Sequence, residues 1–514
     1  MSENDEEYAV TYKTYDDYFT DLDITADTIT EKDLTGTGSE ANPYIVHSTR
    51  GFLWLTNYEL SKIYFSNKFV ELACDIVLNE ESFDKDGNPS GGDGKVYQWK
   101  NFNNGGITLH GNGHEIKGLY MIATGGYAGI FNYPASVKLI DEIDFKGFYC
   151  KGSYASSVGY IVRNASNIIV KDSFFIGTTS AASVGVQGEI YNCINYSYVN
   201  AVSNASGIVG SVIYSAKNCK NFGTVQGEKH VAGITSMVEA KSENTKIENC
   251  ENFGDIYGGV NVGGIVGYRL HDSNVIFECC SNYGDILSGV YKAGIVAFFG
   301  GKLDLINCIN GGYIAVDTAT SGQLVGCVTS RGAVKYSKVK VSECETLPTN
   351  SAPIIASFYL DADDKKLDII VSNCKFDFSK ATEKNVYIIS YVDSKVFAEI
   401  KDVHVLLGLN SKDFYVIDII RNVQNAKIKN ILVEDKALQR TKFVLCSNVS
   451  NETLLAEGII LSGKNMYAGS DFSGFYVDFK TGRFGLKALS GKGFYQGQVT
   501  EEVLKNKGFV KQEI

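Results

Sequence analysis

The chain has 514 residues, which is enough to bury a large core, and its formal net charge is −11. This negative balance argues against nucleic acid as the partner, because phosphate binding needs clustered lysine and arginine. Glycine and tyrosine are abundant and proline is rare, which favours stacked strands and tight turns. Because no apolar run reaches the roughly 18–20 residues of a membrane-spanning helix, we expect no membrane insertion.

The N-terminal region divides into two predicted parts. Residues 1–35 are acidic and rich in threonine and aspartate, without clear periodicity, so we expect an arm that orders only on a partner. We interpret residues 36–105 as a cap of the following repeats. It contains a strand over Asn42–Val46, a helix over Thr49–Leu60 and a strand over Phe69–Leu78. A helix laid over the first repeat would cover an edge that every open solenoid must protect.

A repeat of about thirty residues follows the cap. Five copies align without gaps over their core, beginning at Cys193, Cys219, Cys250, Cys280 and Cys308. Two positions later comes Asn195, Asn221, Asn252, Asn282 or Asn310, and six positions later comes Val199, Val225, Ile256, Ile286 or Ile314. Fourteen positions later comes Gly207, Gly233, Gly264, Gly294 or Gly322. Only the stretch between that glycine and the next cysteine changes length.

This spacing predicts an all-β chain whose main domain is a right-handed parallel β-helix, or solenoid. Each copy has an apolar stripe without a partner, and stacking at about 4.8 Å buries the stripe and pairs the backbone. With fainter copies on both sides, we expect roughly a dozen coils over residues 106–463. The cysteines are predicted to be buried, reduced and stacked. The asparagines are predicted to mark a bend, with left-handed φ or amide bonds between coils.

The last part of the chain, residues 464–514, is predicted to be a separate cap or attachment module. Phe475–Phe479 and Arg483–Leu486 flank Lys480, Thr481 and Gly482, which indicates a β-hairpin. Residues 500–508 have the capping pattern of a short helix, with Thr500 at its start and Gly508 after its end.

The N-terminal half resembles the glycine-rich-repeat β-helix proteins of bacterial surfaces known as GLUG-repeat adhesins. The resemblance covers about residues 36–330. It lies in Gly36-Thr37-Gly38-Ser39, Asn42-Pro43-Tyr44-Ile45, Cys74-Asp75-Ile76-Val77-Leu78, Gly111-Asn112-Gly113-His114, Gly129-Ile130-Phe131 and the Gly-Ile-Val-Gly runs of the repeats. It implies a β-helix architecture and surface adhesion. The chain departs from the family because it shows no secretion signal and no sorting module, a combination that suggests a protein made in a host cytosol and released by lysis.

Few residues suggest chemistry, and we assign no catalytic, cofactor-binding or metal site and expect no cofactor. Asp255 and Asp285 hold one repeat position in successive coils and would suit a retaining glycosidase pair, but both belong to the repeat's own Gly-Asp-Ile motif. Asp141 and Asp144 form a weaker pair. His110 and His114 flank a glycine-rich turn, which excludes a zinc-binding helix. The many tyrosines could offer ring faces to sugars, at a place that the sequence does not reveal.

These observations favour a structural and adhesive virion protein of a bacteriophage, in a fibre, spike or decoration role. Its expected partners are other virion proteins, a host-surface glycan or protein, and further copies of itself in a homotrimer, without nucleic acid. One alternative is a bacterial cell-surface adhesin. The other is a tailspike that degrades polysaccharide with surface carboxylates.

Overall fold

A computed structural model shows an all-β chain whose strands form a parallel β-solenoid of about 11 turns, as the repeat predicted. The structure describes residues 10–511 apart from 65, 101–105, 132–135, 240–243, 317–319, 330–333, 335, 349–351, 360–365, 382–384, 409–412, 436–441, 447–453, 462–463, 466, 469–471, 479–482, 489–493 and 498–509. Contacts divide the chain into two compact units. Unit 1 contains residues 1–238 and 253–255, and unit 2 contains residues 239–252 and 256–514.

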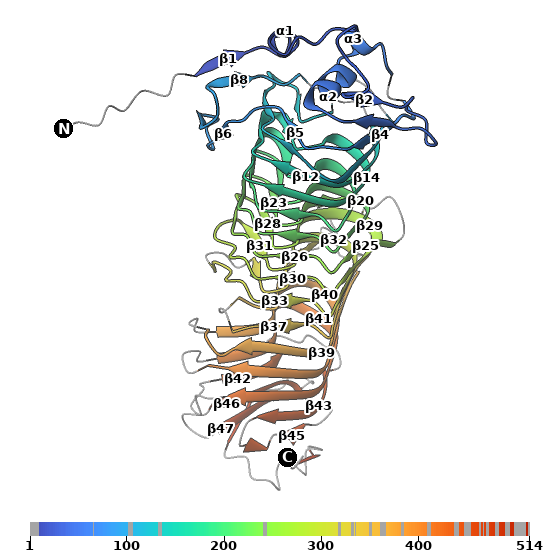
Figure 1. The fold of residues 1–514 in the computed structure, drawn as a ribbon. Helices are drawn as coiled ribbons and strands as arrows, with labels where there is room; N and C mark the ends of the chain where they lie inside the picture. Colours follow the sequence, from blue (N-terminus) through green and yellow to red (C-terminus); the bar gives the residue numbers. More distant parts are fainter. Residues whose placement is uncertain are drawn as a thin grey trace, which may run out of the picture. The chain divides into compact units, whose positions relative to one another are not determined.

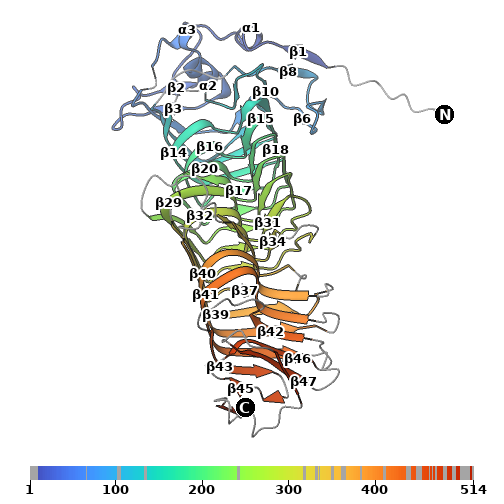
Figure 2. The ribbon, with the colours of Figure 1, turned by 180° about the vertical axis from the view of Figure 1, so that it is seen from behind.

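Unit 1 begins with the cap, and the three helices lie together at this end in both ribbon views (Figure 1, Figure 2). The cap contains β1 (Thr11–Lys13), α1 (Asp17–Asp21), β2 (Leu34–Thr35), β3 (Tyr44–Val46), α2 (Thr49–Thr56), α3 (Tyr58–Ser61), β4 (Phe69–Leu72), β5 (Ile76–Val77), β6 (Ser82–Phe83), β7 (Pro89–Ser90) and β8 (Lys95–Tyr97). The predicted helix is split, because Asn57 leaves the helical conformation and its side chain accepts a hydrogen bond from the Leu60 amide at 3.3 Å. The strand predicted over Phe69–Leu78 is also split, into β4 and β5.

The arm predicted over residues 1–35 is wrong for residues 11–35, which are part of the cap. β1 pairs in parallel with β8. Tyr18 is buried, stacks on Tyr97 with ring centroids 4.3 Å apart, and donates a hydrogen bond to the Leu78 carbonyl at 2.7 Å. The sequence analysis missed these buried aromatic residues, because they lie at irregular spacing in an acidic segment and give no periodic pattern.

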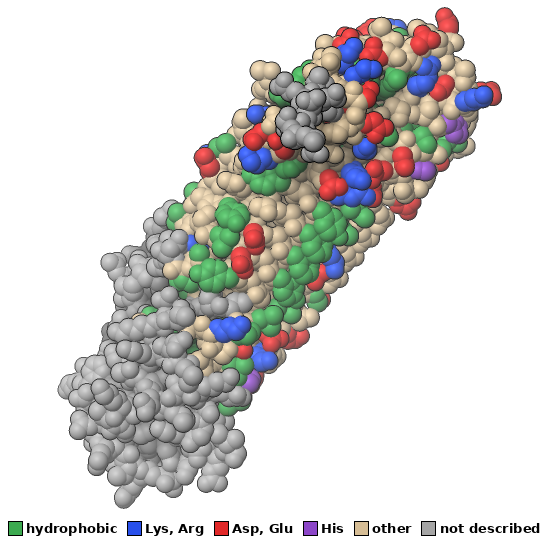
Figure 3. All heavy atoms as spheres, turned by 60° about the vertical axis from the view of Figure 1, so that its left-hand side comes forward, with side chains coloured by type: hydrophobic (Ala, Val, Ile, Leu, Met, Phe, Trp, Pro, Cys, Tyr) green, Lys and Arg blue, Asp and Glu red, His purple; other side chains and the backbone are tan. Residues whose placement is uncertain are grey.

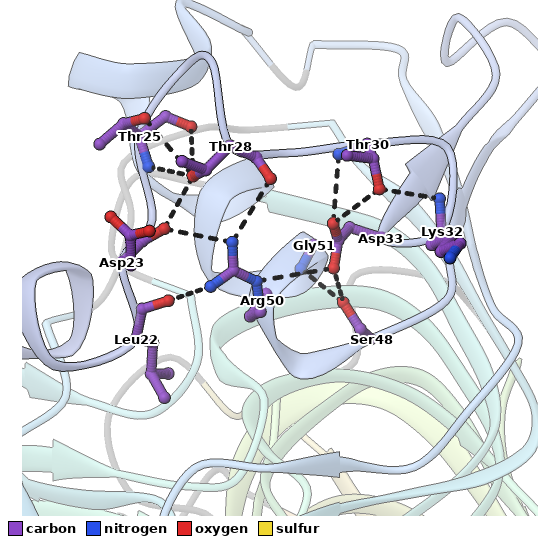
Figure 4. Close-up of polar contacts among 10 residues, drawn as sticks. All are labelled: Leu22, Asp23, Thr25, Thr28, Thr30, Lys32, Asp33, Ser48, Arg50 and Gly51. Carbon is purple, nitrogen blue, oxygen red and sulfur yellow. Dashed lines mark hydrogen bonds and ion pairs between the residues drawn. The ribbon is translucent and has the colours of Figure 1, made fainter.

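A single arginine holds the cap loop against helix α2 (Figure 4). The Arg50 guanidinium donates to the backbone carbonyls of Leu22, Asp23 and Thr28 and lies 3.8 Å from the Asp33 carboxylate. Ser48 caps the helix by accepting from the Gly51 amide at 3.1 Å. These polar contacts tie the loop to the helix, and Ile24 of the same loop is buried in the core.

The coils of unit 1 have two walls of parallel strands. One wall contains β9 (Thr108–Lys117), β12 (Ser136–Lys146), β14 (Gly159–Lys171), β16 (Gly185–Tyr191), β17 (Ile194–Asn195), β20 (Val209–Lys217), β21 (Lys220–Asn221) and β24 (Thr235–Val238). The other contains β10 (Tyr120–Ile122), β11 (Tyr127–Ala128), β13 (Tyr149–Ala155), β15 (Phe174–Ala182), β18 (Tyr198–Ala201), β19 (Asn204–Ser206), β22 (Val225–Gly227) and β23 (His230–Ala232).

Unit 2 continues the same pattern. Its strands are β25 (Asn244–Glu248), β26 (Glu251–Asn252), β27 (Ile256–Tyr257), β28 (Asn261–Gly263), β29 (Val266–Glu278), β30 (Ser281–Asn282), β31 (Tyr291–Ala293), β32 (Val296–Ile306), β33 (Ile309–Asn310), β34 (Ser321–Gly322), β35 (Val325–Thr329), β36 (Tyr336–Ser342), β37 (Glu345–Thr346), β38 (Ile355–Tyr359), β39 (Lys366–Phe378), β40 (Asn385–Leu407), β41 (Asp413–Asp435), β42 (Lys442–Cys446) and β43 (Leu454–Leu461). The longer strands β39, β40 and β41 pair in parallel over most of their length.

The C-terminal strands are antiparallel. β46 (Phe472–Asp478) pairs with β47 (Arg483–Ala488), which confirms the predicted hairpin, and β48 (Phe494–Gly497) adds a third strand. β44 (Lys464–Asn465) pairs with β43, and β45 (Tyr467–Ala468) pairs with β49 (Val510–Lys511). The helix predicted over 500–508 falls outside the described residues.

The core confirms the predicted cysteine register. Cys219, Cys250, Cys280 and Cys308 are free thiols with no exposed surface. In unit 2, the Cys280 thiol interacts with those of Cys250 and Cys308, so these three form a column. Burial raises the pKa of the Cys280 thiol, which therefore stays protonated.

The asparagines two positions after each cysteine are buried, and they form amide ladders rather than left-handed bends. Asn195 Nδ2 donates to Asn221 Oδ1 at 2.8 Å in unit 1. In unit 2, Asn252 donates to Asn282 at 2.8 Å and Asn282 donates to Asn310 at 2.9 Å. Gln323 Oε1 then accepts from Asn310 and ends the ladder. The ladders satisfy polar groups that would otherwise be costly to bury.

Candidate binding face

The coils bend sharply at a corner that, in the five aligned copies, lies one residue before the cysteine, and this corner positions the outward side chains. Residues with positive φ at this corner are Asn112, Glu142, Asn167, Asn192 and Asn218 in unit 1, and Asn249, Cys279, Asn307, Glu343, Asn373 and Asp402 in unit 2. The left-handed conformation costs about 1–2 kcal/mol for most residues, and asparagine visits it most readily after glycine. The predicted asparagine bend therefore exists, but three positions earlier than expected.

Corner asparagines of unit 1 form a second, exposed amide ladder. Asn218 Nδ2 donates to Asn192 Oδ1 at 2.9 Å, and Asn192 Nδ2 donates to Asn167 Oδ1 at 3.0 Å. The next coil places Glu142 opposite Asn167. The corner position beyond the last asparagine of the ladder is therefore occupied by a carboxylate that faces solvent.

Glu142 is also one of two acidic residues that line a shallow depression of about 450 Å³ on unit 1. Corner residues, polar strand residues and two aliphatic side chains line it: Asn112, Gly113, Glu142, Asp144, Asn167, Ile169, Asn192 and Ile194. Asn112 Nδ2 is already used, because it donates to the Leu72 carbonyl at 3.1 Å. The lining therefore combines amides, carboxylates and an aliphatic floor, a mixture that can pair with hydroxyl groups and also pack against C–H groups.

Ion pairs surround the depression. Lys171 Nζ lies 3.0 Å from Asp144 and 3.2 Å from Glu115, on strands β14, β12 and β9 respectively. The hydrogen bond to Asp144, followed by the one to Glu115, raises the pKa of Lys171. Figure 3 shows acidic, basic and histidine side chains gathered on the coil surface beside hydrophobic ones.

The histidines singled out in the sequence both pair with aspartates. His110 Nδ1 lies 2.7 Å from Asp141, and His114 Nδ1 lies 3.1 Å from Asp75. The Glu115 amide also donates to Asp75, and this bond is the first cause of a lowered pKa of the Asp75 carboxyl. Asp141 and Asp144 therefore each have a cationic or imidazole partner.

An exposed aromatic column runs beside the corner, three positions after each cysteine. In unit 1, the ring centroids of Tyr196 and Phe222 lie 4.9 Å apart, and those of Phe222 and Phe253 lie 4.7 Å apart, with interplanar angles of 8° and 4°. These side chains are 37–52% exposed. In unit 2, Tyr283 and Leu347 occupy the same repeat position and close over Gly311, where an added Cβ would lie 3.0 Å or less from both.

The ring geometry limits what the column can bind. A sugar needs about 3.5–4 Å on the ring face that it covers, so none can enter between rings less than 5 Å apart. The interior rings therefore present edges to solvent, and they cannot give the face-on sugar stacking that the tyrosine content suggested. Tyr196 lies two positions after Ile194, which lines the depression, so it is the ring of this column closest in sequence to the depression.

The pair suggested by the repeat, Asp255 and Asp285, falls in different units, so their separation is not defined. Asp255 is exposed, and Asp285 is half-buried and accepts a hydrogen bond from the Tyr313 amide at 2.9 Å. Within the described residues, no group of three or more metal-ligating side chains converges. No helix in those residues is long and apolar enough to cross a membrane.

The sequence contained a signal for this face that the repeat analysis missed. Four of the five aligned copies have asparagine directly before the cysteine, and four have an aromatic residue three positions after it. Aligning the outward positions as well as the inward ones would have located both columns. The depression itself depends on coils before Cys193, where the repeat is faint.

Comparison with known proteins does not identify a family for this chain. No family model matches it, and no curated protein matches it. A solved structure of a proposed immunoglobulin A1 protease from Bacteroides ovatus matches with 14% sequence identity and a TM-score of 0.27, over 70% of this chain and 79% of that one. This TM-score is too low for any property of that protein to be carried over.

Proposed function

We propose that this protein is an adhesive protein that binds a surface glycan through the depression of unit 1. The observation that carries the proposal is the lining: amide and carboxylate groups at coil spacing, with Ile169 and Ile194 between them. Sugars present hydroxyl groups and apolar C–H faces side by side, which suits such a mixture. The stacked coils hold these side chains on rigid strands, so little entropy is lost on binding.

The direct test is a glycan panel with a matched pair of variants. Asn167→Gly removes from the lining the amide whose Nδ2 remains available to a ligand, and glycine keeps the left-handed φ of 55° without strain. Asn307→Gly makes the same change at the same corner position in unit 2. We expect the first variant to weaken the affinity for the best-binding glycan about tenfold and the second to leave it unchanged. Binding to no glycan, or equal losses in both variants, would contradict the proposal.

The carboxylates on this face do not favour polysaccharide cleavage. A retaining or inverting glycosidase needs one carboxylic acid that is protonated at working pH. Glu115 and Asp144 both lie in an ion pair with Lys171, an arrangement typical of a structural charge cluster. We therefore propose binding without hydrolysis. The check is an assay for new reducing ends on the bound glycan, and turnover that is lost in Asp144→Asn or Asp285→Asn would overturn it.

Display on a bacteriophage particle is a separate part of the proposal and rests on the sequence argument alone. Mass spectrometry of purified particles would detect the chain at a fixed stoichiometry with other virion proteins. Recovery from the envelope of uninfected cells, and not from particles, would support the bacterial adhesin instead.

A further inference from the structure

The depression has a surplus of hydrogen-bond acceptors, and this surplus indicates what kind of sugar it binds. Among the described residues, no cation or donor pairs with the Glu142 carboxylate. Asn112 uses its Nδ2 on the Leu72 carbonyl, which leaves its Oδ1 as an acceptor. Asp144 has one oxygen on Lys171, and its second oxygen adds a further acceptor.

Donors in the lining are fewer. Asn192 Nδ2 is used within the exposed ladder, so Asn167 Nδ2 is the side-chain donor left over. A sugar hydroxyl brings only one proton, whereas an ammonium brings three donors and a positive charge. Lys146 has no ion pair among the described residues either, but it does not line the depression.

The charge around the depression points the same way. Carboxylates in and around the depression are mostly paired: Asp141 and Asp75 contact His110 and His114, and Glu115 and Asp144 share Lys171. Lys117 is paired with Glu80 at 2.8 Å, and Lys171 is paired with Glu115 and Asp144. Of the two carboxylates that line the depression, Glu142 is the one without an ion pair among the described residues, so it can bind a cationic ligand and would repel an anionic sugar.

We propose that the depression recognises a glycan that carries a free, protonated amino group, with Glu142 as the anion that binds the ammonium. Asn112 and Asp144 supply further acceptors, and Asn167 donates to a neighbouring hydroxyl. The inference rests on the proposed glycan-binding function and names the chemical class of its ligand. Binding consists of hydrogen bonds and one ion pair, with no covalent step.

The experiment uses the full chain and the best-binding glycan of the panel, before and after N-acetylation with acetic anhydride. At about pH 6 the free amine is charged, because such amines have pKa values of roughly 7.7. We expect N-acetylation to weaken binding at least tenfold, and high salt to weaken the binding of the free-amine form. Glu142→Gln should weaken the free-amine form about tenfold and leave the N-acetylated form unchanged.

Glu343→Gln is the matched control, because Glu343 occupies the same left-handed corner position in unit 2, with a φ of 58° against 51° for Glu142. Equal affinity for both forms of the glycan, or a best-binding glycan that has no amine, would overturn the amino-group inference and leave the adhesive function standing. Binding that chelation with EDTA abolishes would show that Glu142 holds a divalent cation instead. Failure to bind any glycan would remove both proposals.

Discussion

At the residue scale, the thiol column is a test of which side of each strand faces the core. Each thiol in the column donates to the carbonyl two residues earlier, as Cys250 does to Glu248 at 3.4 Å and Cys280 to Glu278 at 3.5 Å. The column therefore packs like a set of small apolar side chains with one local hydrogen bond each. Because the thiols have no exposed surface, a charged side chain at these positions would not be solvated.

We expect Cys250→Asp to destabilise the fold by at least 3–5 kcal/mol, because a buried carboxylate there would lack a cationic partner. Cys250→Ala deletes only the packing of one sulfur and should cost about 1 kcal/mol. Urea denaturation of both variants measures the difference. Thiol labelling of the native protein is the companion measurement, and fast labelling of Cys219, Cys250, Cys280 and Cys308 would mean that the register is wrong.

Lys292 is a second residue-scale case. It lies in β31 with no exposed surface, in register with Val262 and Ser321 of the neighbouring coils. Burial lowers the pKa of Lys292 to about 8. Between about pH 8 and 10.5 the folded state has released this proton and the unfolded state still holds it, so this group makes stability rise with pH in that window.

Lys292→Met should therefore stabilise the protein at pH 7, by about 1–2 kcal/mol, because it replaces a buried charge with an apolar side chain of similar length. The gain should shrink as the pH rises from 8 to 10.5. Thermal or urea unfolding of both proteins across this range gives the comparison. A constant difference between the two would show that Lys292 is already charged and solvated in the fold.

At the element scale, the stability of the cap depends on Tyr18 of α1, whose buried side chain reaches the loop after β5. Tyr18→Phe removes the hydrogen bond to the Leu78 carbonyl, which is then left without this donor, and should cost about 1–3 kcal/mol. Tyr214→Phe makes the same chemical change at a side chain that is 49% exposed and should cost less than 0.5 kcal/mol. Chemical denaturation gives the free energy of unfolding of both variants. Equal values for the two would mean that α1 does not contribute to the folded cap.

The inward positions of each coil were predicted from the sequence, whereas the outward columns were missed although the corner asparagines and the aromatic residues also recur. Cysteine, asparagine and β-branched residues recur at fixed offsets because every coil meets the same neighbours, so burial imposes a period. In the N-terminal cap, β3, the helical segment and the β4–β5 segment were predicted, but the roles of Tyr18 and Arg50 were not, because their contacts have no period. The depression could not be predicted, because most of its lining lies on coils before Cys193, where the repeat is faint.

At the scale of the whole molecule, the sequence predicts a homotrimer, and the mass in solution tests it. The monomer has a mass of 56.1 kDa. Light scattering with size-exclusion chromatography should give three times this value if the exposed aromatic edges pack between copies, because exposed apolar patches often mark protein–protein contacts. A monomeric mass would instead favour a single adhesive chain. Phe222→Ser, at a side chain that is 40% exposed, should then shift a trimer toward monomer.

The buried amide ladder has a direction, and that direction bears on how such a protein can grow. Asn195, Asn252 and Asn282 each donate to the asparagine of the following coil, so the two faces of such a coil differ, and coils that carry this asparagine present equivalent faces. A duplicated stretch of gene that encodes one coil would meet its neighbours with the correct donor on one side and the correct acceptor on the other. Length could therefore change by whole coils without any new interface, until a residue such as Gln323 ends the chain of amides. In related sequences, the position of the residue that ends the ladder would therefore indicate how many coils carry the buried asparagine.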